Sequence, residues 1–318
     1  MGLIKQPGEI APKKTISALI YGQPGSGKTS IGCSAPFPVL FDADGGVQRI
    51  NGAHRVPTVQ ITSWDDVAGA IAEIEELEKT HQLRCETIIV DTAGKLLDFM
   101  TAHIIKNNPK MKQGDGSLSL KGYGVRKSMF VDFIKRLSTM GKSIIFIAHE
   151  REEKRGEDTV KRPEIGGSSA GDLIKELDLV GYMQLAGRDR TISFTPQEWF
   201  YAKNTCNLED CIKIPVTVDP ATGEAVGNNN FLSLIISRFE ESQKKTTEKT
   251  AAYEQLVNDI DDAVAGANTA DDLNSLMAQL AKREAIYNSH LLAKQKIVAR
   301  AKVLNVSYNA VEKRYVNA

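Results

Sequence analysis

Ten residues near the start of the chain, Tyr21 to Ser30, contain the pattern G-x-x-x-x-G-K-[ST]. Glycines there let the backbone curl so that successive N–H groups point into one concavity, which suits a polyanion. A helix that follows would add the positive end of its dipole. Lys28 would contact the β- and γ-phosphates of ATP, and the Thr29 hydroxyl would ligate Mg²⁺. The pattern predicts a phosphate-binding loop made of Gly22, Gln23, Pro24, Gly25, Ser26, Gly27, Lys28, Thr29 and Ser30.

An acidic residue ends an apolar run downstream of this loop. Asp91 comes directly after Thr87 to Val90, which reads as a buried strand. Nucleotide sites with a phosphate-binding loop place at such a strand end the acid that holds a magnesium-bound water. The loop and this strand end together predict a Mg²⁺ site formed by Thr29 and Asp91.

Hydrolysis also requires a group that activates or orients the attacking water. Asp42 and Asp44 follow one apolar run, and Glu150 follows another. All three carboxylates are candidates, and the residues alone do not choose among them. His149, beside Glu150, could sense the γ-phosphate and pass its loss to the segment that follows.

Apolar runs alternate with segments of helical spacing, which predicts an α/β fold with a parallel sheet covered on both faces. Later strands have no helices between them, which predicts an antiparallel extension. The expected strands are 16–21, 38–41, 55–61, 87–90, 143–148, 179–185, 190–194, 198–202 and 211–218. Helices are expected at 63–77, 95–106 and 125–140, and one opens near 166. The segments 107–124 and 150–164 are expected to be a mobile loop and a flexible charged loop.

Composition changes near Glu240. The polar, lysine-rich stretch 241–250 is expected to link a core domain, 1–240, to a helical C-terminal domain, 251–318. Three apolar stripes at helical spacing follow, near 253–264, 269–280 and 289–304. They are expected to be the packing faces of a small bundle.

Bulk properties exclude several classes. The 318 residues carry a formal net charge of zero, so any polyanion contact must come from a local patch. Four scattered cysteines without a C-x-x-C pattern argue against a zinc site and for reduced thiols in a cytosol-like compartment. The first residues lack an apolar signal region, and no stretch is long enough to span a bilayer. We expect an intracellular protein without a membrane partner.

The motifs together resemble the RecA-type recombinases and hexameric helicases. The stretch Phe41 to Asp44 is similar to the one in which the recombinases carry their catalytic glutamate two residues after an aspartate. The resemblance gives the role of base to Asp44, whose side chain is one methylene shorter. Ile88 to Thr92 resembles the second nucleotide motif, and Ile145 to Glu150 resembles the sensor strand.

Two basic segments fall where this class has its DNA-contacting loops. The first, 106–127, implies contacts by Lys110, Lys112, Lys121, Tyr123, Arg126 and Lys127, with Tyr123 stacking on a base. The second, 150–167, ends in the pair Gly166-Gly167 and implies contacts by Arg155, Lys161 and Arg162. Its charges nearly cancel, so the first segment is the better candidate.

A further resemblance lies in Tyr201 to Asn204. ATPases of this class project a basic finger from such a stretch toward the nucleotide of the neighbouring subunit. Lys203 matches the first basic residue, and Thr205 stands where a second is usual. A role for Lys203 in trans requires an oligomer.

The compact core and the helical C-terminal extension look most like phage-encoded RecA-like ATP-binding proteins, among them single-strand annealing proteins of the Sak type. The resemblance implies a Mg²⁺-ATP-dependent protein that binds single-stranded DNA and promotes annealing or strand pairing, acting in a bacterial host cytoplasm. Its expected partners are single-stranded DNA, further copies in a filament or ring, and a single-strand-binding or replication protein at the C-terminal helices. Two alternatives stay open: a helicase or helicase loader, and a nucleotide-gated module that recruits replication partners.

Overall fold

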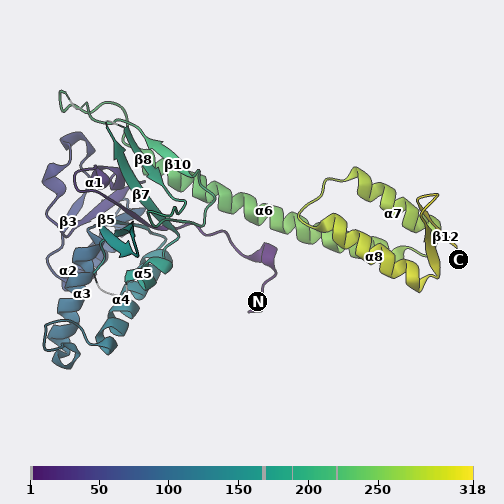
Figure 1. The fold of residues 1–318 in the computed structure, drawn as a ribbon, viewed down its shortest axis with the longest axis horizontal. Coiled ribbons are helices and arrows are strands. Elements are labelled where there is room, and N and C mark those ends of the chain that lie inside the picture. The colour runs from purple at the N-terminus through teal and green to yellow at the C-terminus, as the bar shows by residue number, and fades with distance from the viewer. Residues whose placement is uncertain (1–2, 167–169, 188, 220, 318) are drawn as a thin grey trace. The chain divides into compact units, whose positions relative to one another are not determined.

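The computed structural model describes residues 3–166, 170–187, 189–219 and 221–317. The chain divides into two compact units. One comprises residues 13–240 and contains the large sheet seen in Figure 1. The other joins residues 1–12 to residues 241–318, so the N-terminal segment expected in the core belongs with the C-terminal unit.

The first unit is built on a ten-stranded sheet with the order β10-β8-β7-β1-β5-β4-β2-β3, in which β6 pairs with β5 and β9 with β7. Strands β7, β1, β5, β4, β2 and β3 are parallel, and β6, β8, β9 and β10 are antiparallel to their neighbours. The mostly parallel sheet with an antiparallel extension is confirmed. The bounds are β1 Ser17–Gly22, β2 Pro38–Asp42, β3 Thr58–Gln60, β4 Thr87–Asp91, β5 Ser143–Arg155, β6 Asp158–Pro163, β7 Leu179–Ala186, β8 Asp189–Ser193, β9 Lys203–Asn204 and β10 Cys211–Ile214.

Helices cover both faces of this sheet, because the central strands are apolar on both sides. Side chains such as Tyr21, Val90 and Phe146 form one core with α2, α3 and α4, which Figure 1 shows together on one side. Ile89 and Ile147 on the opposite face pack with α1 and with the start of α6 (Phe231–Gly266). The helices of this unit are α1 Lys28–Gly32, α2 Trp64–Lys79, α3 Ala93–Asn107, α4 Leu120–Thr139 and α5 Ala170–Lys175.

Two segments expected to be flexible have regular structure. Residues 107–119 form an ordered tip between α3 and α4. Its Met111 and Leu118 pack with Ile104 of α3, and the Ser119 hydroxyl caps α4. Residues 150–163 continue β5 and return as β6, which makes an antiparallel hairpin. In contrast, 198–202 forms no strand, although isolated bridges involve Phe200.

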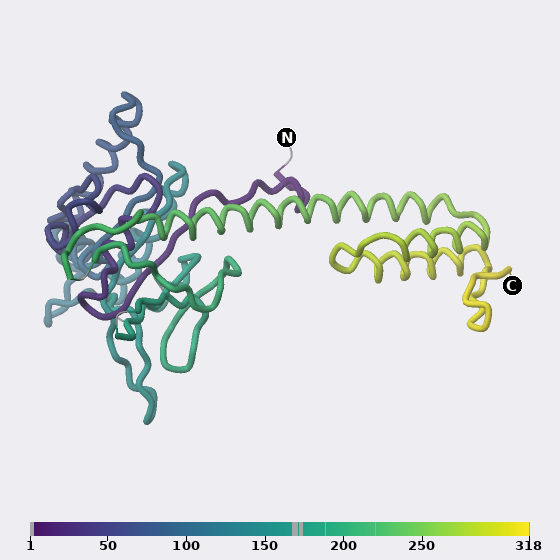
Figure 2. The backbone as a smooth tube through the Cα atoms, turned by 90° about the horizontal axis from the view of Figure 1, so that it is seen from above, coloured from purple at the N-terminus to yellow at the C-terminus, as the bar shows by residue number. Residues whose placement is uncertain are grey.

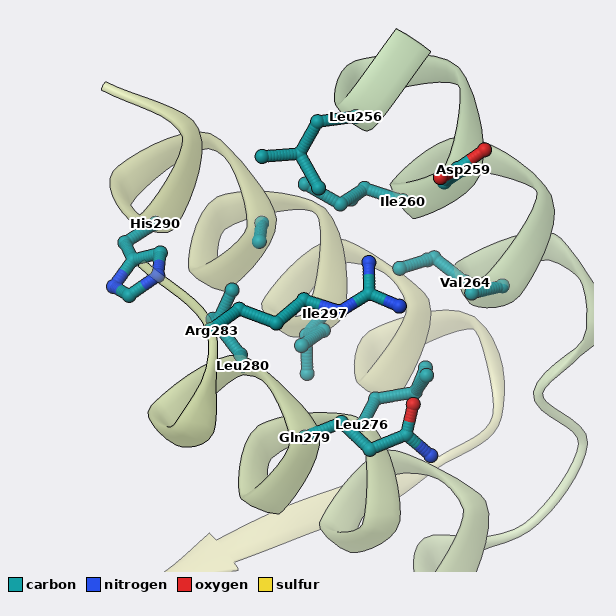
Figure 3. Close-up of a pocket in the computed structure, with 12 residues that line it drawn as sticks. Leu256, Asp259, Ile260, Val264, Leu276, Gln279, Leu280, Arg283, His290 and Ile297 are labelled. Carbon is teal, nitrogen blue, oxygen red and sulfur yellow. The ribbon is translucent and has the colours of Figure 1, made fainter. Parts of the chain in front are cut away.

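The C-terminal unit is helical, with a terminal strand pair. The expected linker 241–250 is instead part of the long helix α6, where Lys245 and Glu241 pair one turn apart at 2.8 Å. Figure 2 shows α7 and α8 alongside the second half of α6. Between these three helices lies a mostly apolar hollow of about 150 Å³, with Leu256 and Ile260 on one wall and Leu280 opposite (Figure 3). The bounds are α6 Phe231–Gly266, α7 Ala270–Lys282, α8 Ser289–Val303, β11 Val306–Asn309 and β12 Arg314–Asn317.

Among the helices of the described residues, none combines the length and the apolar character that a membrane span requires.

Candidate nucleotide-binding site

The phosphate-binding loop lies between β1 and α1, as its pattern predicts. Its backbone has positive φ angles at Gly25 (77°) and Gly27 (89°), a conformation that glycine adopts without strain. Gly22 is required for a different reason, because a Cβ there would lie 2.4 Å from the carbonyl oxygen of Met183 in β7. The Ser26 hydroxyl closes the loop by donating to the carbonyl of Gln23 at 2.8 Å.

Lys28 is the first residue of α1, and its side chain turns back over the loop. Its Nζ donates to the carbonyl oxygens of Gly22 at 3.0 Å and Gln23 at 2.6 Å. Only 5% of the residue is exposed, and burial lowers the pKa of the ammonium group. Neutral carbonyls compensate this buried cation only in part, so an anion in the loop would be bound strongly.

Thr29 and Asp91 lie together at the carboxyl ends of the central strands. The Thr29 hydroxyl donates to Oδ2 of Asp91 at 2.6 Å. Burial raises the pKa of Asp91, with a smaller contribution from the negative charges of Asp42 and Asp44, although the bond from Thr29 acts in the opposite direction. A hydroxyl and a carboxylate are hard oxygen ligands, and a cation beside Asp91 would relieve its burial cost. The residues therefore fit Mg²⁺.

A cavity of about 190 Å³ lies over the loop. It is lined by the predicted residues Asp44 and His149, and Nδ1 of His149 is buried without a hydrogen-bond partner among the described residues. Arg49 and Ile50 also line it and were not predicted, because a charged and an apolar residue in an irregular segment give no motif. The lining residues are Gly25, Gly27, Lys28, Thr29, Ser30, Asp44, Gly46, Arg49, Ile50, Asp91, Ile147 and His149.

The three candidate bases have different surroundings. Asp42 is 3% exposed and accepts from the backbone N–H groups of Gly46 at 2.9 Å and Val47 at 3.1 Å, so it shapes the loop after β2. The N–H of Asp44 donates to the Asp91 carbonyl at 3.2 Å, which holds Asp44 beside Asp91. Of the three, Asp44 alone lines the cavity.

Glu150 is not placed to act as a base. Successive residues of a strand point to opposite faces, so Glu150 points away from the cavity that His149 lines. Its carboxylate accepts from Nζ of Lys161 at 3.0 Å and from the Tyr182 hydroxyl at 3.0 Å. Glu150 is therefore engaged by Lys161 and Tyr182 and does not line the cavity, and its catalytic role stays a prediction without support from this geometry.

Lys203 is also engaged within its own chain. Its Nζ donates to the carbonyl oxygens of Lys175, at 2.6 Å, and Leu177, just after α5. Cations at this position compensate unpaired carbonyls at a helix end. In this conformation Lys203 does not project as a finger, and Thr205 donates to the Asp178 carbonyl at 2.8 Å.

The first basic segment places its residues in two environments. Lys110 and Lys112 are exposed on the tip between α3 and α4, and Lys121 is exposed in the first turn of α4. Tyr123, Arg126 and Lys127 lie further along α4, and Tyr123 and Lys127 are half-buried.

Arg126 is a correction to the predicted DNA contacts. It is 4% exposed, and its guanidinium donates to Thr101 Oγ1 at 3.1 Å and to the Gly166 carbonyl at 2.9 Å. It also lies over the Tyr123 ring, 4.9 Å from the centroid. Arg126 therefore packs α4 against α3 and the segment after β6, and it is not available to a DNA phosphate.

The second basic segment pairs its cations with its own acids. Lys161 contacts Glu150 at 3.0 Å and Glu152 at 2.7 Å, while Arg162 contacts Glu153 at 3.1 Å. Arg155 lies 3.8 Å from Glu153. In this structure Lys161 and Arg162 are paired with acids of the hairpin, and Arg155 is exposed at the edge of that network; their DNA contacts stay a prediction. Gly167, the second glycine of the predicted closing pair, lies outside the described residues.

Comparisons with known proteins agree with this site. A family model described as an AAA domain matches residues 14–206, more than half of the chain. The SPbeta prophage-derived uncharacterized protein YorG of Bacillus subtilis (strain 168) is 25% identical over 173 residues, which cover 54% of this chain and 51% of that protein. The chain thus spans about half the length of the curated relative that it matches. Since the matched residues include the phosphate-binding loop and Asp91, the chain belongs to the AAA-domain family of P-loop ATPases.

Proposed function

We propose that this protein binds Mg²⁺-ATP and single-stranded DNA together and promotes annealing or strand pairing in phage recombination. The observation that carries the nucleotide part is the bond from Thr29 to Asp91 at 2.6 Å, beside a cavity that Asp44 and His149 also line. In this proposal Lys28 neutralises the phosphates, and Thr29 and Asp91 hold Mg²⁺. Asp44 orients the attacking water, and His149 senses the γ-phosphate.

The DNA part rests on exposed lysines of the tip between α3 and α4 and of the first turn of α4. Lys110 and Lys112 are exposed in the tip and Lys121 at the start of α4, and the acid of the tip, Asp115, accepts from the Ser117 hydroxyl at 2.7 Å. Exposed lysines without a carboxylate partner are suited to DNA phosphates, which they bind by releasing counterions.

Backbone contacts connect this tip to the nucleotide edge. Helix α3 starts at Ala93, two residues after Asp91, and the Glu164 N–H donates to the His149 carbonyl at 2.7 Å. Arg126 of α4 then holds the Gly166 carbonyl. A shift of His149 on nucleotide binding would thus reach α4 through residues 164–166 and Arg126. We infer that DNA and nucleotide increase each other's affinity, since such coupling is reciprocal.

Self-assembly on DNA, as a filament or a ring in the cytoplasm of a bacterial host, belongs to the same proposal. A second candidate is a nucleotide-gated module that recruits a single-strand-binding or replication protein. The observation that favours it is the C-terminal unit, which has apolar clusters of its own and the mostly apolar hollow between α6, α7 and α8.

The test is binding of a fluorescent single-stranded oligonucleotide with and without ATP and Mg²⁺, across a salt series. We expect ATP to tighten binding, and we expect affinity to fall with salt. Lys110, Lys112 and Lys121 would be changed together to Gln, which should reduce the salt slope by about 2 if all three contact phosphates. The matched control changes three exposed lysines away from the tip, Lys79, Lys95 and Lys135, and should keep the slope. DNA binding that responds to neither salt nor nucleotide would exclude the proposal and favour the recruiting module.

A further inference from the structure

An arginine of the antiparallel extension lies against the phosphate-binding loop. Nη1 of Arg190, in β8, is 2.6 Å from the position that a Cβ on Gly27 would occupy, and its Cζ is 3.9 Å away. Gly27 is the N-cap of α1 and directly precedes Lys28. The Arg190 guanidinium therefore touches the loop at the N-terminal end of α1, where the helix dipole favours phosphate binding.

The strand register fixes Arg190 in this place. It pairs with Leu185 of β7 on one side and with Ile214 of β10 on the other. Strand β7 in turn touches the loop where the Met183 carbonyl approaches Gly22. The backbone of Arg190 is thus held between two strands, one of which contacts the loop directly.

The charge of Arg190 has no counter-ion among the described residues. No hydrogen bond or ion pair within those residues involves its guanidinium, which carries five N–H donors, and the residue is half-buried. The neighbouring carboxylate of Asp189 pairs with Lys213 at 2.8 Å and does not neutralise it. A guanidinium that has no partner among the described residues, next to an anion-binding loop, is suited to an anionic ligand.

We propose that Arg190 contacts the phosphates of the nucleotide bound to its own chain. The inference rests on the proposed nucleotide binding at the loop and adds a cation in cis. It differs from the expectation for Lys203, a cation delivered to another subunit. Lys203 holds the carbonyls of Lys175 and Leu177, whereas Arg190 is unpaired beside the loop. Arg190 should then contribute to nucleotide affinity in a single chain, without a second subunit.

The experiment measures the affinity of the full chain for ATP, ADP and adenosine by competition against a fluorescent ATP analogue. We expect Arg190→Ala to weaken the affinity for ATP and ADP by about 10-fold or more and to leave the affinity for adenosine within about 2-fold of wild type. Arg190→Lys should recover part of the loss, because it restores the charge without the planar fork. Lys203→Ala is the matched control and should stay within about 2-fold. Wild-type affinity should not change on dilution of the protein.

Each alternative outcome would contradict a different part of the proposal. If Arg190→Ala weakened adenosine binding as much as ATP binding, Arg190 would contact the nucleoside, and the assignment to the phosphates would be wrong. Wild-type affinity in Arg190→Ala would overturn the contact, and a loss in Arg190→Ala that appears only at protein concentrations at which the chain associates would overturn its placement in cis. A wild-type chain that binds no nucleotide would instead refute the proposed function itself. Urea unfolding of each variant shows whether a loss of nucleotide affinity comes from misfolding. If Arg190→Ala is misfolded, the ATP affinity of Arg190→Lys decides whether Arg190 contacts the phosphates.

Discussion

His149 and Glu150 are consecutive residues of β5, but their side chains lie in two regions that differ in whether polar groups have hydrogen-bond partners. His149 faces the cavity over the phosphate-binding loop, where its Nδ1 has no partner in the described chain and where burial raises the pKa of Asp91. Glu150 faces away from that cavity and accepts from Lys161 and Tyr182. At the nucleotide edge, Nδ1 of His149 is buried without a partner among the described residues, whereas the carboxylate of Glu150 is paired within the β5–β6 hairpin and with Tyr182. An unsatisfied buried group beside an anion-binding loop is suited to a ligand.

The largest expected effect tests the unsatisfied side of this comparison. Lys28→Ala removes the ammonium that lies on the loop carbonyls. We expect ATP affinity to fall about 100-fold, because a charge-assisted contact to the phosphates is lost. The free energy of unfolding of the nucleotide-free protein should not fall by a comparable amount, because burial disfavours the Lys28 cation and lowers its pKa. Titration with a fluorescent ATP analogue measures the first effect and urea unfolding the second. Affinity within 3-fold of wild type would remove Lys28 from the site.

The satisfied side predicts the opposite pattern. Lys161→Ala should lower the free energy of unfolding by about 2 kcal/mol, because it leaves the carboxylate of Glu150, 9% exposed, without its cation. Nucleotide affinity should stay within about 2-fold. Lys154→Ala on the same hairpin is the control, since Lys154 is exposed, and it should change stability by less than about 0.5 kcal/mol. If Lys161→Ala weakens nucleotide binding without loss of stability, the two regions do not differ as described.

Asp91 gives a prediction that depends on pH. Because its pKa is raised in the folded protein, its protonated form is favoured there, and folding gains stability as pH falls through the folded pKa towards the unfolded one. Above the folded pKa that gain is lost. Asp91→Asn keeps an acceptor for Thr29 and should therefore stabilise the nucleotide-free protein at pH 7.

Two measurements check this prediction. Urea unfolding between pH 4 and pH 8 should show the advantage of Asp91→Asn shrinking as pH falls. Thermal unfolding with ADP should show stabilisation by Mg²⁺ in the wild type and none in the variant, because the carboxylate ligand is gone. A variant that is less stable at pH 7 and still responds to Mg²⁺ would place the metal elsewhere.

The contrast also explains how far the sequence was informative. The loop and the strand that ends at Asp91 are local patterns, in which residue type and spacing determine the geometry. The same holds for the strands of the parallel sheet. Because they are buried on both faces, each is a continuous apolar run that can be identified from its own residues alone. These elements, and the carboxylate of Asp44 at the cavity, were predictable.

The roles of single cations were not predictable in the same way. Arg126 and Lys112 stand in one basic segment, yet one is buried against the Gly166 carbonyl and the other is exposed. Lys203 serves the carbonyls after α5, and the lysine-rich stretch 241–250 is helical through pairs one turn apart. Each outcome depends on the group that the tertiary fold brings near the cation. A count of charges along the chain contains no such information.

The smallest expected effect concerns His149, at the boundary between the two regions. His149→Gln keeps a polar side chain, and His149→Ala removes it. Neither should change ATP affinity by more than about 3-fold, because Lys28, Thr29 and Asp91 remain. The coupling between nucleotide and DNA should fall in His149→Ala and be partly kept in His149→Gln, because the unpartnered Nδ1 is the group free to respond to a γ-phosphate. The measured quantity is the ratio of oligonucleotide affinities with ATP and with ADP. Should that ratio stay at its wild-type value in His149→Ala, the unsatisfied nitrogen has no sensing role, and the contact from Glu164 to the His149 carbonyl is only structural.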